Sequence, residues 1–165
     1  MLRQIKIAVE ESGKQIRSSA YWNQKTIQQR LAALHNELSF NINLYSKFKE
    51  HTEIKGYGVR FDSFVLISLE NFLLEFYFND IDLYIDLKIL HTIMSRHNNY
   101  IKATIDCPKI YDPEQIHNML MKEFQEYEPT FNDTLNKISN HIDEAVPLIK
   151  TLEDEVELTL IKTEV

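Results

Sequence analysis

The sequence contains few of the residues that mark disulfide scaffolds, phosphate loops or metal sites. Among 165 residues it has one cysteine, three glycines and four prolines. The lone Cys107 excludes an internal disulfide, and a reduced, cytoplasmic compartment is therefore expected. The scarcity of glycine excludes a Gly-rich phosphate loop. With no cysteine cluster and no complete metal-ligand motif, we expect no metal site and no cofactor.

A long hydrophobic run is also missing. The most apolar window, residues 64–78, contains Glu70, Asn71 and Glu75 and is too short and too acidic to span a bilayer. Glu10 and Glu11 interrupt the apolar beginning of the chain, which excludes the pattern of a signal peptide. The sequence therefore predicts no membrane span.

The balance of charge is acidic and uneven. A net charge of -7 argues against general affinity for nucleic acid or for anionic membranes. Residues 1–30 carry six Lys and Arg against two acids, whereas residues 113–165 carry twelve acids against four lysines. These opposite signs predict that the two terminal segments attract each other.

The scarcity of glycine and proline favours long helices, and four are predicted. They cover about residues 13–51, 64–78, 80–104 and 113–163, with breaks near Pro129 and Pro147. The first contains a heptad seam, in which apolar residues recur alternately three and four positions apart. Asn41 fills one slot of this seam and is a candidate for setting register or partner number. The other seam positions are Ile27, Leu31, Leu34, Leu38, Tyr45 and Phe48.

The second predicted helix is apolar almost all round, which is typical of the middle of a bundle or of an interface, and Ser63 is its expected N-cap. Short connections favour an all-α fold, an elongated up-down-up-down four-helix bundle with long first and last helices, in a single domain covering residues 1–165. Alternation of Ile5, Ile7 and Val9, and of residues 156–160, is equally typical of strands. The terminal segments are therefore predicted as helix, with a short two-stranded β ribbon as the alternative.

One short motif suggests catalysis. The run Arg30-Leu-Ala-Ala-Leu-His35 resembles the active motif of the HEPN family, all-helical domains that commonly dimerise and often cleave RNA. The resemblance implies that His35 takes part in proton transfer and that Arg30 stabilises charge on the phosphate. It covers six residues and departs from the family pattern at Leu31, where a polar residue is common. The alternative is an arginine and a histidine on the flank of an amphipathic helix.

Further candidates are interaction residues. His97 occupies a position of the apolar seam of the third helix. It is interpreted as a pH-dependent interface switch or, alternatively, as a hydrogen-bonded histidine at the edge of the core. Phe72, Phe76 and Tyr77 belong to an aromatic turn that lines a pocket, forms an interface or closes a helical hairpin. Glu114 and His117 have the Glu-x-x-His spacing of di-iron bundles, but no second forward motif accompanies them.

The sequence thus favours a non-enzymatic helical-bundle protein that acts by self-association, as a dimer, or by binding a protein partner. The first alternative is a HEPN-like, metal-independent ribonuclease that uses Arg30 and His35, with RNA as its partner. The second alternative is a sensor-type helical domain, because the free ends of two long helices emerge together.

Overall fold

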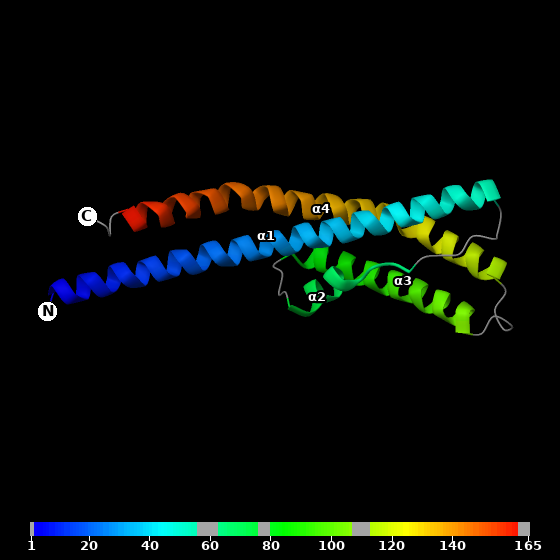
Figure 1. Ribbon diagram of the computed structural model, residues 1–165, viewed down its shortest axis with the longest axis horizontal. Helices are drawn as coiled ribbons and strands as arrows, with labels where there is room; N and C mark the ends of the chain where they lie inside the picture. Colours follow the sequence, from blue (N-terminus) through cyan, green and yellow to red (C-terminus); the bar gives the residue numbers. More distant parts are fainter. Residues whose placement is uncertain (1, 56–62, 76–79, 107–112, 162–165) are drawn as a thin grey trace. The chain divides into compact units, whose positions relative to one another are not determined.

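The chain forms four helices, and all-α is the correct fold class. The computed structural model describes residues 2–55, 63–75, 80–106 and 113–161. They contain helices α1 (Leu2–Lys55), α2 (Ile67–Glu75), α3 (Ile81–Asp106) and α4 (Pro113–Ile161), and no strand (Figure 1). Ile5, Ile7 and Val9 lie in α1 and residues 156–160 in α4, so the predicted helix is confirmed there and the β ribbon is not observed.

The helix ends agree only in part with their sequence-based positions. Helix α1 begins before Gly13, where a side chain would meet only the Arg17 guanidinium at 3.8 Å, so this glycine marks no close approach of the backbone. Helix α3 begins at its predicted place, because Asp80 Oδ1 accepts a hydrogen bond from the Leu83 amide at 2.9 Å.

Helix α4 continues through both prolines. Each proline removes one amide donor and leaves the carbonyl four residues earlier, on Gln125 or Asp143, without its helical partner. Pro129, Pro147, Gln125 and Asp143 are all exposed, so water can satisfy these carbonyls. The helix therefore tolerates both prolines, and the breaks predicted near them are not observed.

Two compact units can be distinguished, and each is described by itself. Unit 2 comprises residues 33–138 and holds a dense apolar core. The buried seam residues Leu34 and Leu38 of α1 belong to it. Its other buried apolar residues are Tyr45, Phe64, Leu69, Phe72, Leu83, Leu87, Leu90, Ile93, Met94, Ile101, Ile116, Leu120, Phe124, Phe131 and Ile138.

Unit 1 comprises residues 1–32 and 139–165 and buries much less. Of its residues with described burial, Tyr21 and Leu31 alone are buried. The Tyr21 hydroxyl donates to Glu153 Oε1 at 3.2 Å and accepts from Lys25 Nζ at 2.7 Å. The hydrogen bond to Tyr21 raises the pKa of Lys25, and the Glu153 charge adds to the effect. The Tyr21–Glu153 hydrogen bond thus joins the basic start of the chain to its acidic end within this unit, and the general attraction of the two segments stays a prediction.

No helix in the described ranges has a run long and apolar enough to cross a membrane.

An aromatic cluster fills part of the unit 2 core. Tyr45 of α1 stacks on Phe124 of α4 with ring centroids 3.6 Å apart, and Phe124 also stacks on Phe131 at 4.9 Å. The Tyr45 hydroxyl is buried and has no hydrogen-bond partner among the residues that the structure describes. Burial, with a smaller contribution from the Glu128 charge, raises the pKa of Tyr45 to about 12.

Tyr45→Phe is expected to leave the protein as stable as the wild type at neutral pH or more stable, because it removes an unpaired buried hydroxyl. The unfolded chain ionises this tyrosine near its ordinary pKa of 10, before the folded protein does. The wild-type free energy of unfolding should therefore fall between about pH 10 and 12, with roughly 1–2 kcal/mol due to Tyr45. Urea titrations of both proteins across this range measure the difference, and parallel pH profiles would contradict the assignment.

Candidate functional site

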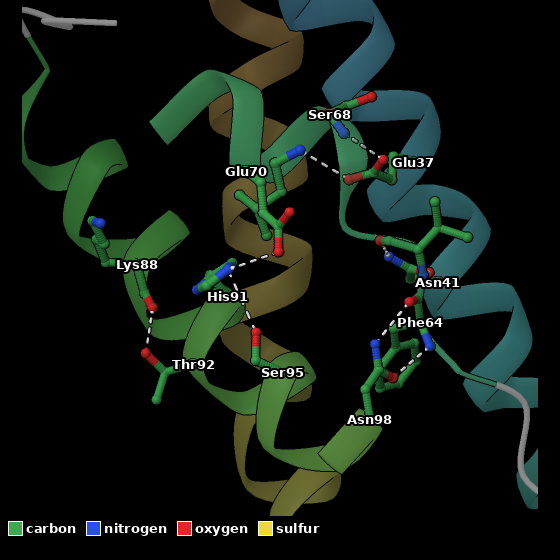
Figure 2. A network of polar contacts seen from close by, with 12 residues as sticks. Glu37, Asn41, Phe64, Ser68, Glu70, Lys88, His91, Thr92, Ser95 and Asn98 are labelled. Carbon is green, nitrogen blue, oxygen red and sulfur yellow. Dashed lines mark hydrogen bonds and ion pairs between the residues drawn. The ribbon is translucent and has the colours of Figure 1, made fainter. Parts of the chain in front are cut away.

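Residues 63–66, which precede α2, are not helical, although the sequence predicts a helix from residue 64. Two asparagines from other helices bind the backbone there (Figure 2). Asn98 of α3 accepts from the Phe64 amide at 2.8 Å and donates to the Phe64 carbonyl at 2.9 Å. Asn41 of α1 accepts from the Val65 amide at 2.9 Å and donates to the Val65 carbonyl at 2.7 Å. Each asparagine thus satisfies both main-chain groups of one residue.

Glu37 binds the next part of the same segment. Its carboxylate accepts from the Ser68 amide at 2.7 Å and from the Leu69 amide at 2.9 Å. These amides lie in the first turn of α2, where helix donors lack internal partners and where the helix dipole favours a negative charge. Glu37 of α1 therefore caps the N-terminus of α2. The prediction that Ser63 caps this helix is wrong. Glu37, Asn41 and Asn98 are called the main-chain clamp below.

The clamp is largely removed from water. Asn41 is 0% exposed and Glu37 is 8% exposed. Asn41 Nδ2 also lies 3.5 Å from Met94 Sδ. Because buried amides and carboxylates are costly without partners, these residues hold the segment more strongly than surface groups would.

Apolar anchors accompany the clamp. The Phe64 ring is buried against His97, with centroids 4.4 Å apart, and lies 5.5 Å from the Phe124 ring. Leu69 and Phe72 of α2 are buried as well. The segment is therefore fixed by main-chain hydrogen bonds and by three apolar side chains.

A second polar contact joins α2 to α3. His91 Nε2 lies 3.5 Å from Glu70 Oε1 and 3.4 Å from the Ser95 hydroxyl (Figure 2). His91 is half-buried and Glu70 is exposed. The contact is an ion pair only when the imidazole is protonated, because a neutral imidazole carries no charge.

The predicted catalytic pair lies on α1. Arg30 is exposed and belongs to unit 1, whereas His35 is partly buried and belongs to unit 2. Five residues of α-helix turn the side-chain direction by about 140°, so the two side chains leave the helix axis in different directions.

The predicted interaction residues lie in different places. Asn41, Phe72 and His97 are buried in unit 2. Phe76 and Tyr77 lie outside the described residues. The side chains of Glu114 and His117 are likewise not among those described, and among those that are, no group of three or more His, Cys, Asp and Glu can hold a metal ion.

Sequence reasoning missed two of the three clamp residues. Glu37 and Asn41 are four residues apart and share one helical face, so a carboxylate one turn before the polar seam residue was the available signal. Asn98 gave no such signal, because its partner Phe64 is 34 positions away.

Removing one clamp amide should destabilise the protein. Asn41→Ala removes a fully buried side chain and leaves the part-buried main-chain groups of Val65 without their partners, and we expect a loss of about 2–4 kcal/mol. Asn98→Ala should cost about 1–3 kcal/mol, since this site is less buried. The exposed neighbour Asn99 is the control, and Asn99→Ala should change stability by less than about 0.5 kcal/mol. Chemical denaturation measures all three, and equal effects at residues 98 and 99 would refute the clamp.

No protein-family model, no curated protein and no solved structure matches the chain.

Proposed function

We propose that the protein is a non-enzymatic interaction module that self-associates through the beginning of α1. A row of exposed β-branched residues on this helix carries the proposal. Ile5, Val9 and Ile16 are 56%, 66% and 67% exposed. Large aliphatic side chains in a row at such exposure are typical of a surface that another chain covers.

The spacing of this row fits a helical partner. Positions 5, 9, 12 and 16 alternate four and three residues apart, which is the repeat of a coiled-coil seam. Ser12 fills the remaining slot. Val9 and Ile16 take the a positions of this repeat, where β-branched residues favour a two-stranded pairing, and a second copy of the same helix presents a matching row. This association row, Ile5, Val9, Ser12 and Ile16, is the proposed interface.

The burial within unit 1 supports the same conclusion. A helical pair that buries only Tyr21 and Leu31 among its described residues gains little from its own packing. Covering the three aliphatic side chains on each of two copies would contribute about 6–12 kcal/mol. Loss of translational and rotational freedom opposes this by about 4–15 kcal/mol. The two terms are of similar size, as a weak and reversible dimer requires, and the population of such a dimer depends on concentration.

Polar substitutions in the association row should abolish the dimer. We expect wild-type protein at high micromolar concentration to sediment as a dimer, and the double variant Val9→Ser, Ile16→Ser to sediment as a monomer with unchanged helicity. Val146→Ser is the matched control, because Val146 is 49% exposed on α4 and lies outside the row. A strictly monomeric wild-type protein under these conditions would overturn the proposal. The direction of the two paired helices can be tested with Val9→Cys in a Cys107→Ser background. A parallel pair brings the two introduced cysteines together and should form a disulfide-linked dimer, whereas an antiparallel pair should not.

The non-enzymatic proposal and the ribonuclease alternative make opposite predictions for RNA cleavage. If the protein acts only by association, purified wild type and His35→Ala should leave a labelled single-stranded RNA equally intact over hours. Cleavage by the wild type that disappears in both His35→Ala and Arg30→Ala, with the dimer preserved, would establish the HEPN-like function and refute the non-enzymatic one. The measurement is RNA electrophoresis on the same fractions that are used for sedimentation.

A further inference from the structure

We propose that the main-chain clamp is a peptide-binding site. Its present occupant is the chain's own segment 63–75, and it accepts a segment of the same pattern from another polypeptide chain. The ligand class is a peptide whose first four residues are non-helical and whose remainder is helical, as in residues 63–75.

The hydrogen bonds of the clamp point to peptide recognition. Six hydrogen bonds run from Glu37, Asn41 and Asn98 to the segment, and every one ends on a main-chain atom. Contacts of this kind do not depend on the side chains of the bound segment, which is how peptide receptors obtain affinity from the backbone. The clamp residues lie on α1 and α3, so they belong to the receptor and not to the ligand.

Selectivity comes from three side chains of the segment. Phe64, Leu69 and Phe72 are buried at 6%, 0% and 2% exposure. In contrast, Ile67 and Leu74 are 69% and 84% exposed and make little use of the site. The site therefore selects an aromatic residue, an aliphatic residue five positions later and a second aromatic residue three positions after that.

The clamp favours continuous occupation. If the segment left, the buried side chains of Asn41 and Glu37 would lose the main-chain partners that the segment gives them. Tethering gives the chain's own segment an effective concentration in the millimolar range. A segment from another chain therefore binds measurably only when the internal segment is weakened.

The test weakens the internal segment and supplies the ligand separately. The full-length variant Phe64→Ala, Leu69→Ala keeps the clamp, and the probe is a fluorescent synthetic peptide with the sequence of residues 63–75. We expect saturable binding by fluorescence anisotropy and a higher melting temperature of the variant with peptide. Wild-type protein should bind the probe at least tenfold more weakly. If the double variant does not fold, Phe64→Leu is the milder substitution for the same measurement.

Two altered peptides separate main-chain recognition from general hydrophobic adhesion. Methylation of the Val65 amide nitrogen removes the donor to Asn41 Oδ1 and should weaken binding at least tenfold. The Ile67→Ala peptide, altered at an exposed position, should bind as the parent peptide does. Equal affinity for the parent and the methylated peptide, or no binding by a folded weakened variant, would overturn the proposal. The Val9→Ser, Ile16→Ser background removes self-association from these measurements, so the two proposals fail or stand separately.

Discussion

The structure of unit 2 depends on how the extended backbone of Phe64 and Val65 obtains its hydrogen bonds. A helix satisfies its own amides and carbonyls, but two extended residues inside a helical protein cannot, and unpaired main-chain groups are costly away from water. Asn98 supplies a donor and an acceptor to Phe64, and Asn41 supplies a donor and an acceptor to Val65. Polar contacts to the main chain therefore join α1 and α3 to the start of α2, in addition to apolar packing.

The apolar core follows from this arrangement. Once its main chain is held, Phe64 reaches both His97 and Phe124, and Phe124 in turn stacks on Tyr45. The rings meet closely, and the Tyr45 hydroxyl is buried without a partner among the described residues. Asn41 and the Tyr45 hydroxyl thus lie in the same core. Hydrogen bonds explain the presence of Asn41, whereas the Tyr45 hydroxyl has none among the described residues.

Periodicity predicted the helices because it reflects local geometry. Leu34, Leu38 and Asn41 form one stripe with helical spacing, and the stripe is buried as expected. Local rules failed where a partner is distant in sequence. Ser63 looked like a cap because it precedes an apolar run, but the cap is Glu37, which lies 31 positions before Ser68, whose amide it binds. Ile5, Ile7 and Val9 alternate as a strand would, yet in α1 the first and third of them belong to a heptad row that the alternation concealed.

The two proposed kinds of recognition place different demands on the two units. Unit 2 pairs the main-chain groups of Phe64 and Val65, so under the peptide-binding proposal a ligand reaches the clamp only by replacing the segment that is already bound. Unit 1 buries little and leaves the aliphatic side chains of Ile5, Val9 and Ile16 in water. Nothing must be displaced from that row before a second helix covers it. Association through unit 1 should therefore respond to protein concentration, whereas exchange in unit 2 should respond to the stability of the internal segment.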